Sequence, residues 1–348
     1  MDKQSPKPSA SQAEKFSPST MKDIAERAGV SIMTVSRAIR SPHLLSEETL
    51  TRVRQAIEAN GYVTNSLAGS HGFRRTATVA MVVPSLQNSL FASTVQAASE
   101  TLGHHGFSLM LAASGWDSDE EERAISMFLA QRPAGLILHD TVHSERTLAM
   151  LRNAHLPIVE TGDLIADPLD AVVSFSNQKA ADVATTHLLD KGYTRIALVS
   201  LPLDVNARAR ARLQGYRAAL KRRRIPYDEA RVIQTPGGVV AGAKALLTVL
   251  ESKPDTDAIF FAGDVGVIGA MLECQRRGWD VPARIAVAAL DALENEVAQF
   301  LSPVLTSVQV PRADIGRFAA QTIVSRCKGE AVASRVDVGF RLIEGQSS

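Results

Sequence analysis

Residues 19–64 show apolar side chains at helical spacing in three short stretches. The segment Thr20-Met-Lys-Asp23 has the form of a capping box and begins the first helix, which Gly29 ends. Ser31 and Ser46 are favourable N-caps for a second and a third helix. Three short helices with a glycine turn between the first two predict an all-α helix-turn-helix unit.

Beyond residue 78 the pattern changes to short apolar runs that alternate with amphipathic stretches. Such runs predict buried strands, and the stretches between them predict helices. The predicted strands are 79–83, 108–112, 135–138, 157–159, 171–173, 195–199, 258–261 and 285–289. The predicted helices are 90–104, 119–131, 178–191, 207–223, 240–251 and 265–277. This alternation predicts two α/β lobes with parallel sheets, and ligands of such folds bind at the carboxyl ends of the strands.

Composition marks the boundaries of these parts. Residues 1–18 are rich in Ser, Pro, Lys and Gln and lack the apolar stretch of a secretory signal, which predicts a disordered leader and no export. Residues 65–78 are rich in Ser, Gly, His, Arg and Thr and predict a hinge or linker. The two lobes then occupy residues 79–340, and residues 341–348 form a C-terminal tail.

Charge and cysteine content narrow the function classes. Residues 1–78 hold 11 Lys and Arg against 7 Asp and Glu, a charge of +4, while the remaining chain carries −3. This asymmetry suits contact of the front part with a polyanion. The two cysteines, Cys274 and Cys327, lie far apart and predict reduced packing thiols in a cytoplasmic protein. No apolar run is long enough to cross a membrane, and no motif predicts a metal or a cofactor.

The second predicted helix begins with apolar residues at positions that a helix-turn-helix unit exposes. A helix starting at Ser31 can enter the major groove by its N-terminal end, where its free amides meet phosphate. Ile32 and Met33 would then contact thymine methyl groups or base faces. The alternative is that both side chains belong to an ordinary core.

Several segments resemble the LacI/GalR family of bacterial regulators. The headpiece resemblance runs from Thr20 to Arg37. It continues through Leu45–Thr49, Gly61-Tyr62, Val82–Pro84, Gly192–Ile196 and Gly215–Leu220. Met33–Arg37, Glu273–Arg276 and Asp337–Phe340 are most similar to the gluconate-repressor branch. The resemblance implies a periplasmic-binding-protein-like sensor of two lobes behind the helix-turn-helix headpiece.

This resemblance implies contacts with double-stranded operator DNA. Thr20, Thr34, Ser36 and Arg37 match family positions that contact phosphate or bases, and the Arg37 guanidinium can bind a guanine bidentately. In the family a hinge helix follows the headpiece and inserts a leucine into the minor groove. The corresponding candidates here are Asn65, Leu67, Ala68 and His71. His71 stands at the leucine position, so this chain departs from the family pattern, and Leu67 is the alternative wedge.

The resemblance also implies an effector site between the lobes. The matching positions are Phe91, Glu160, Arg212, Asp264 and Asp291. Arg208 is a further candidate because of its position on the predicted helix. Arg208 and Arg212 share one helix face, whereas Arg210 points nearly opposite. A pair of arginines favours a small anionic, sugar-like effector such as gluconate or ketogluconate.

Other function classes have weaker support. Gly263, Gly266 and Gly269 are spaced GxxGxxG, which differs from a dinucleotide fingerprint and is typical of helix packing. No Walker A loop and no GxSxG elbow indicates an enzyme. An α/β enzyme or an exported sugar-binding receptor remains the alternative to a regulator. A regulator of this kind is expected to be a homodimer on a pseudo-palindromic operator, because protein symmetry matches site symmetry.

Overall fold

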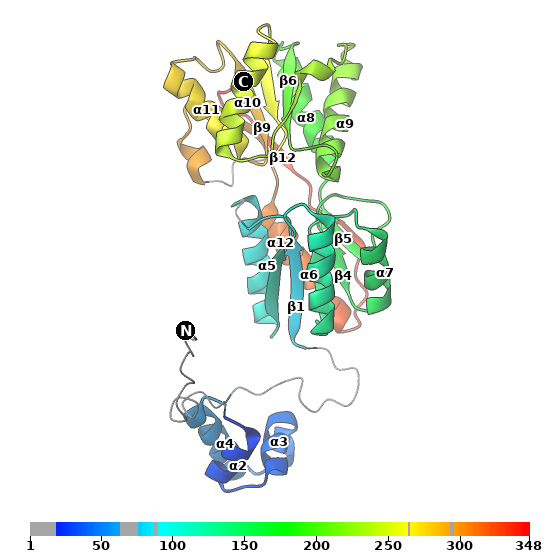
Figure 1. The fold of residues 1–348 in the computed structure, drawn as a ribbon, viewed down its shortest axis with the longest axis vertical. Coiled ribbons are helices and arrows are strands. Elements are labelled where there is room, and N and C mark those ends of the chain that lie inside the picture. The colour runs from blue at the N-terminus through cyan, green and yellow to red at the C-terminus, as the bar shows by residue number, and fades with distance from the viewer. Residues whose placement is uncertain (1–18, 63–75, 87–88, 264, 293–295) are drawn as a thin grey trace, which may run out of the picture. The chain divides into compact units, whose positions relative to one another are not determined.

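The computed structural model describes residues 19–62, 76–86, 89–263, 265–292 and 296–348. The chain forms two compact units, Met1–Phe73 and Arg74–Ser348 (Figure 1). The three-helix unit and the two-lobed unit expected from the sequence are both present, and the predicted fold class is confirmed.

The first unit contains the three predicted helices, α2 (Met21–Ala28), α3 (Ile32–Arg40) and α4 (Glu47–Asn60). The capping box is formed, because the Asp23 amide donates to the Thr20 hydroxyl and the Thr20 amide donates to the Asp23 carboxylate at 2.7 Å. These hydrogen bonds from Thr20 lower the pKa of Asp23. Gly29 ends α2 at a φ of +63°, which only glycine adopts without strain.

A small apolar core holds these helices together. Ile24 of α2, Val35 of α3 and Val53 of α4 are fully buried against one another. The exposed residues of α2 and α4 are mostly polar, whereas α3 also carries apolar residues outside this core. The unit therefore has a defined inner face, and α3 keeps its N-terminal residues outside.

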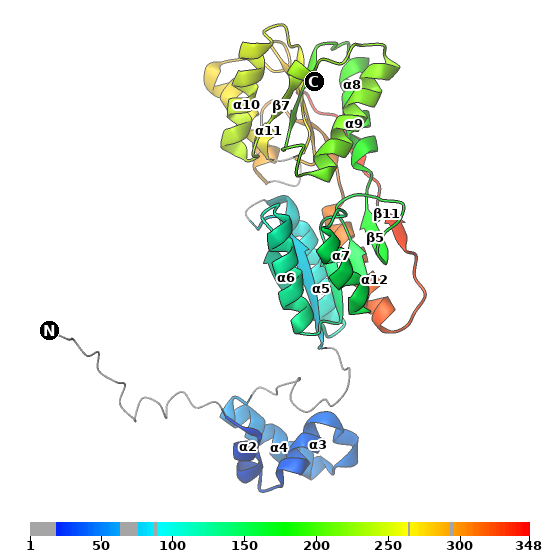
Figure 2. The same ribbon diagram turned by 45° about the vertical axis from the view of Figure 1, so that its right-hand side comes forward.

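The second unit consists of two six-stranded sheets with helices on both faces (Figures 1 and 2). The first sheet has the order β11-β5-β4-β3-β1-β2, and the second has the order β12-β10-β9-β8-β6-β7. The strands of the first are β1 (Thr78–Val83), β2 (Ser108–Ala113), β3 (Gly135–Leu138), β4 (Ile158–Glu160), β5 (Ala171–Ser174) and β11 (Arg335–Asp337). Those of the second are β6 (Ile196–Ser200), β7 (Val232–Gln234), β8 (Ala258–Phe261), β9 (Ala286–Leu290), β10 (Thr306–Gln309) and β12 (Arg341–Ile343). All neighbouring strands are parallel except β10 and β12.

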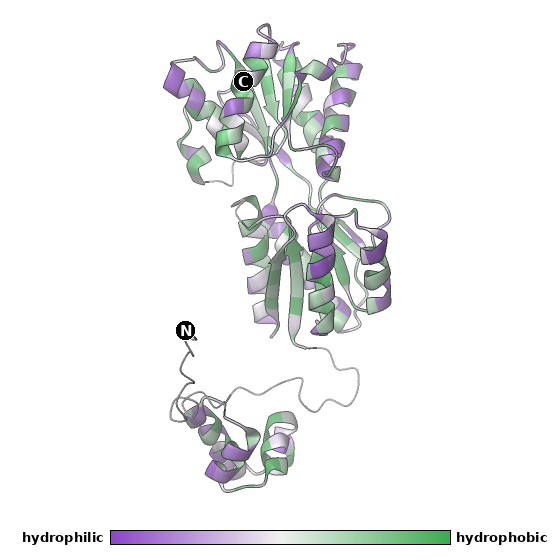
Figure 3. Ribbon diagram, in the orientation of Figure 1, coloured by the Kyte–Doolittle hydropathy of each residue, from purple (hydrophilic) through white to green (hydrophobic). Residues whose placement is uncertain are grey.

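Helices cover each sheet in pairs. The first sheet lies between one pair, α5 (Ala92–His104) with α12 (Arg312–Cys327), and another, α6 (Ser118–Ala130) with α7 (Glu145–Ala154). The second lies between α8 (Asn177–Asp190) with α9 (Ala207–Arg222) and α10 (Val239–Ser252) with α11 (Gly266–Arg277). The central strands are apolar and buried, whereas the outer faces of the helices carry the polar residues (Figure 3).

The α10 and α11 pair explains the glycine spacing seen in the sequence. A Cβ on Gly269 would lie 1.7 Å from the Val239 carbonyl oxygen, so the two helix backbones touch at this position. Gly266 and Gly269 therefore serve helix packing, as predicted, whereas Gly263 precedes α11.

The predicted C-terminal boundary is wrong. Residues 341–348 are part of the second lobe, because β12 pairs antiparallel with β10 and the Ser347 side chain is fully buried. The Val287 amide donates to the Ser347 carbonyl oxygen at 2.7 Å, which fixes the segment beside β9. At the other end of the unit, β1 begins at Thr78, within the predicted linker.

The chain passes between the two lobes three times. The passages follow β5, β10 and β11, so α12 and β11 return to the first lobe before β12 completes the second. Each lobe is therefore assembled from separate parts of the sequence, and the carboxyl ends of their strands supply the residues of one cavity.

Candidate DNA-binding and effector sites

The N-terminal turn of α3 presents two exposed apolar side chains. Ile32 is 49% and Met33 is 68% exposed, whereas Val35 is fully buried. This exposure excludes the alternative that both belong to the core. Ser31 caps the helix, since its hydroxyl accepts from the Thr34 amide at 3.1 Å. The first turn therefore offers apolar groups beside free amide groups, as contact with bases and phosphate requires.

The other candidates of this headpiece lie on or beside the same helix. Thr34 and Ser36 are half-buried, and Arg37 is exposed. The Thr34 hydroxyl also hydrogen-bonds the Ser31 hydroxyl at 2.9 Å. Thr20 donates its hydroxyl to Asp23 within the capping box. The candidates Asn65, Leu67, Ala68 and His71 lie outside the described residues, as does the effector candidate Asp264.

A closed cavity in the second unit brings together side chains from both lobes. Its free volume is about 30 Å³. Its lining consists of Leu90, Phe91, Trp116, His139, Leu201, Asn206, Arg208, Arg212, Gly263 and Arg312. Typical small-molecule sites measure roughly 300 Å³ or more. Large buried side chains occupy most of this space, so a sugar-sized ligand enters only when they move.

Arg212 is fixed from three sides on α9. Its Nε donates to the Asn177 side-chain oxygen at 2.8 Å, and its Nη1 donates to the Ala262 carbonyl oxygen at 2.9 Å. Gly263 adopts a φ of +81°, and a Cβ there would lie 2.2 Å from Nη1. Burial lowers the pKa of Arg212 to about 10, and the charges of Arg208 and Arg312 act in the same direction. The guanidinium therefore sits in a site that favours added negative charge.

Arg208 lies one turn earlier on α9 and reaches the first lobe. Its Nη1 donates to the His139 carbonyl oxygen at 2.6 Å and lies 3.6 Å from an Asp140 carboxylate oxygen. Its guanidinium carbon stands 4.8 Å from the centre of the Trp116 ring. Burial lowers the pKa of this guanidinium as well.

The Asp291 carboxylate is paired with Arg312, an arginine that was not predicted from the sequence as a site residue. Asp291 follows β9 at a φ of +64°, and its carboxylate accepts from Arg312 Nε at 2.7 Å and also from Nη2. Arg312 begins α12, which packs on the first sheet, so this buried ion pair joins the two lobes. Burial raises the pKa of Asp291, while Arg312 opposes the shift. The second carboxylate oxygen, Oδ1, is buried without a hydrogen-bond partner among the described residues.

An aromatic wall closes the cavity on the side of the first lobe. The predicted residue Phe91 lies 4.6 Å from the His139 ring centre, edge to face, and 6.2 Å from that of Trp116. Burial holds the pKa of His139 well below its usual value, so the ring is neutral. Sequence reasoning missed Trp116 and His139, although each follows a strand of the first sheet.

Glu160, another predicted effector residue, is not among the residues that line this cavity. Its carboxylate accepts from the Leu169 amide at 2.7 Å and lies 3.6 Å from His143 Nε2. His143 Nδ1 is 3.0 Å from the Glu121 carboxylate. Burial lowers the pKa of His143, but Glu121 and Glu160 outweigh it and raise that pKa to about 9. Glu160 thus belongs to a buried ionic triad whose histidine is on the same loop as His139 and Asp140.

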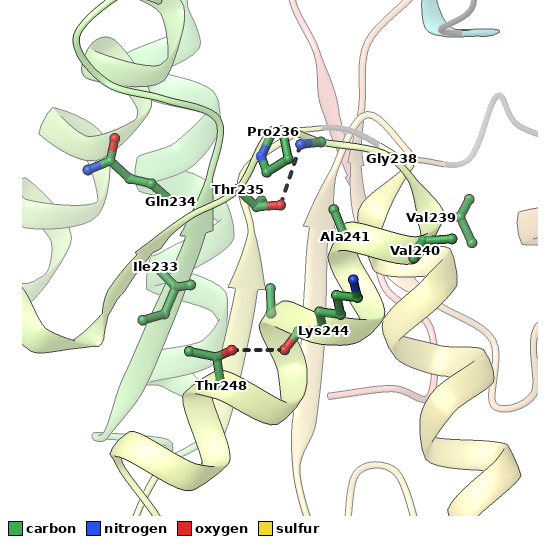
Figure 4. Close-up of a pocket in the computed structure, with 12 residues that line it drawn as sticks. Ile233, Gln234, Thr235, Pro236, Gly238, Val239, Val240, Ala241, Lys244 and Thr248 are labelled. Atoms are coloured by element: carbon green, nitrogen blue, oxygen red, sulfur yellow. Dashed lines mark hydrogen bonds between the residues drawn. The ribbon is translucent and has the colours of Figure 1, made fainter.

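A larger cavity of about 580 Å³ lies elsewhere on the second lobe, between β7 and α10 (Figure 4). Its wall is mostly apolar, and Lys244 is the one charged residue that lines it among the described residues. None of the predicted site residues borders it. Its volume alone does not make it the effector site, because it lacks convergent polar groups.

The described residues contain no group of three His, Cys, Asp or Glu side chains placed to hold a metal ion. Within the same ranges no helix is long and apolar enough to span a membrane. The two sites described above therefore carry the chemistry considered below.

Comparison with known proteins agrees with this organisation. Residues 20–65 match the family "Bacterial regulatory proteins, lacI family", and residues 76–344 match "Periplasmic binding proteins and sugar binding domain of LacI family". The HTH-type transcriptional regulator GntR of Pseudomonas aeruginosa is 35% identical over 332 residues, covering 94% of this chain and 95% of that protein. IdnR of Escherichia coli is 32% identical over 332 residues, covering 94% and 98%.

A solved structure of a LacI-family transcriptional regulator from Silicibacter pomeroyi superposes with a TM-score of 0.88 at 30% identity. It covers 95% of this chain and 99% of that one. The two family models together cover both units, and the relatives align with this chain over nearly their whole length. This chain belongs to the LacI family of bacterial transcriptional regulators: it is a DNA-binding regulator with a sugar-binding effector domain, and not an enzyme.

Proposed function

We propose that this protein is a homodimeric repressor that binds a pseudo-palindromic operator and responds to a small sugar acid such as gluconate or ketogluconate. The observation that carries the effector class is the convergence of Arg208, Arg212 and Arg312 on one closed cavity. Buried guanidinium groups favour ligands that bring negative charge and several hydrogen-bond acceptors. The resemblance to the gluconate-repressor branch supports the same class.

The DNA-binding part of the proposal rests on the first turn of α3. Exposed Ile32 and Met33 fit thymine methyl groups, and Arg37 on the outer face can reach phosphate or guanine. Asn65, Leu67, Ala68 and His71 are proposed to contact the centre of the operator.

The dimer is supported by exposed apolar side chains on the second lobe. Phe300 is 86% exposed, and Val297 and Val304, which are near it in the sequence, are about half exposed. Such a cluster on a folded surface is typical of a protein interface. A second copy of this chain fits it, because two symmetric headpieces match two operator half-sites.

A panel of ligands tests the proposal directly. Thermal unfolding of the full chain is followed with aldonates, ketoaldonates, neutral sugars and polyols, because a ligand that binds the folded state raises the melting temperature. We expect a shift with a sugar acid and the same acid to change operator affinity in a mobility-shift assay. A shift with neutral sugars alone contradicts the acid, and no preference for any palindromic duplex over random DNA contradicts the operator.

A further inference from the structure

Arg208 differs from the other two arginines of the cavity in how its charge is satisfied. Arg212 donates to Asn177 and to a backbone carbonyl, and Arg312 is paired with Asp291. Among the described residues, Arg208 has one hydrogen-bond partner, the His139 carbonyl oxygen, and its nearest carboxylate, that of Asp140, is 3.6 Å away. Arg208 is therefore held by one hydrogen bond and one longer ion pair.

One nitrogen of Arg208 has no hydrogen-bond partner. Arg208 is only 4% exposed, and its Nη2 is buried without a partner among the described residues. Since Arg208 lines the cavity, a ligand bound there would lie beside this residue. A buried donor without an acceptor is costly, and the cost is larger for a charged group.

The rest of the side chain is held in place around that nitrogen. The Trp116 ring lies beside the guanidinium at 4.8 Å, and Nη1 is tied to the His139 carbonyl in the first lobe. A planar guanidinium fixed at one edge presents its other edge in a defined direction. An acceptor bound there would be linked through Arg208 to both lobes.

We infer that Arg208 is the residue that distinguishes an acidic effector from a neutral one, by donating from Nη2 to the ligand's carboxylate while Nη1 stays on the first lobe. This inference rests on the proposed sugar-acid effector. A carboxylate supplies a charged acceptor for Nη2, whereas a hydroxyl at the same place supplies only a weaker one. The ligand also completes a bridge between the lobes, which favours their closed arrangement.

The test compares an acid with its neutral counterpart. Binding of D-gluconate and of D-glucitol to the full chain is measured by calorimetry at constant ionic strength, for the natural protein and for Arg208→Met. A hydrogen bond between charged groups corresponds to an affinity ratio of about 10 to 100. We expect the variant to lose that factor for gluconate and to bind glucitol within about threefold of the natural protein.

Arg210→Met is the matched control. Arg210 lies on the same helix, is exposed, and donates only to the Leu203 and Asp204 carbonyls of its own lobe. Its removal should leave both affinities unchanged. Arg208→Gln is measured in parallel, because it keeps a donor without the charge and stands in for Arg208→Met if the latter unfolds early.

The outcomes separate this inference from the proposed function. If the natural protein prefers gluconate and both Arg208 variants keep the same preference, Arg208 is not the discriminating residue, although the sugar-acid function stands. If the natural protein binds glucose 6-phosphate more tightly than gluconate, the carboxylate assignment is overturned. If no sugar acid binds the natural protein at all, the proposed effector and this inference both fail.

Discussion

At the scale of single residues, the effector cavity is defined by how each buried charge is paired. Arg212 and Arg312 are held by Asn177 and Asp291, which places both guanidinium groups before any ligand arrives. Groups fixed in this way lose little freedom on binding, so their contacts contribute more to affinity. Residues that hold the arginines therefore matter as much as those that touch the ligand.

Replacement of Arg212 by alanine should separate ligand binding from DNA binding. The variant loses its donors in the cavity, whereas the headpiece is a separate unit. We expect operator affinity to stay within about twofold while the effector response falls at least tenfold, measured by mobility shift over an effector titration. Arg217, which stacks on Tyr227 at 4.4 Å, provides the control as Arg217→Ala. A normal response from Arg212→Ala contradicts the assigned site.

The buried triad of Glu121, His143 and Glu160 should make stability depend on pH. The pKa of His143 is raised in the folded state to about 9 from an ordinary 6.5, so protonated His143 stabilises the fold. This contribution is fully present below about pH 6.5 and is lost as the pH rises through 9. It amounts to about 3 kcal/mol. The free energy of unfolding of the natural protein, relative to His143→Gln, should fall by that order between pH 6 and pH 9.5 in denaturant titrations; a constant difference contradicts the triad.

At the scale of elements, prediction from the sequence is most accurate where the residues within one helix or strand determine its conformation. The apolar run 258–261 forms β8 with those bounds, and the capping box of Thr20 starts α2. β7 and β11 were missed because they are edge strands of only three residues, too short for a periodic signal, and pairing with β6 and β5 forms them. Helix α12 was missed as well, and with it Arg312.

Prediction of the site residues likewise depends on whether their partners are close in the sequence or distant from them. Phe91 and Arg212 were predicted from family positions, and Arg208 was predicted because it shares a helix face with Arg212. All three line the cavity. The pairing of Glu160 with His143 was not predicted, because the histidine is 17 positions earlier and reaches Glu160 only after the fold has formed. The role of Asp291 was incomplete for the same reason, since its pairing depends on where α12 places Arg312.

The contact between α10 and α11 should tolerate no side chain at Gly269. A Cβ at 1.7 Å from a backbone oxygen forces the helices apart, and overpacking of this kind costs about 1–3 kcal/mol. Gly269→Ala is therefore expected to lower the free energy of unfolding by that amount in urea. The control is Gly103→Ala in α5, where a Cβ meets no atom within 4 Å and the variant should be neutral or slightly more stable. Equal effects at both positions contradict close packing at Gly269.

At the scale of the whole molecule, the two units carry different sites. The first carries the exposed turn of α3, and the second carries the cavity and the exposed apolar cluster around Phe300. Changes in the first unit should thus alter DNA binding alone, and changes in the cavity should alter only the response to the effector.

Removal of the headpiece tests this division. A chain comprising residues 74–348 should bind the sugar acid with unchanged affinity by calorimetry and show no operator binding by mobility shift, because the compact unit remains whole. The same chain should remain dimeric in sedimentation, and the substitution Phe300→Asp should make it monomeric. Loss of ligand binding without the headpiece contradicts independent units.

The three passages of the chain between the lobes also govern the order in which the protein can be made. During translation the first sheet lacks its edge strand until Asp337 has left the ribosome, and the second lacks β12 until Ile343 has done so. A nascent chain that ends before β11 lacks the edge strand of both lobes, so it can complete neither sheet. Premature stop codons late in the gene should therefore yield proteolysed product rather than a working half, because both lobes would expose unpaired edges at once.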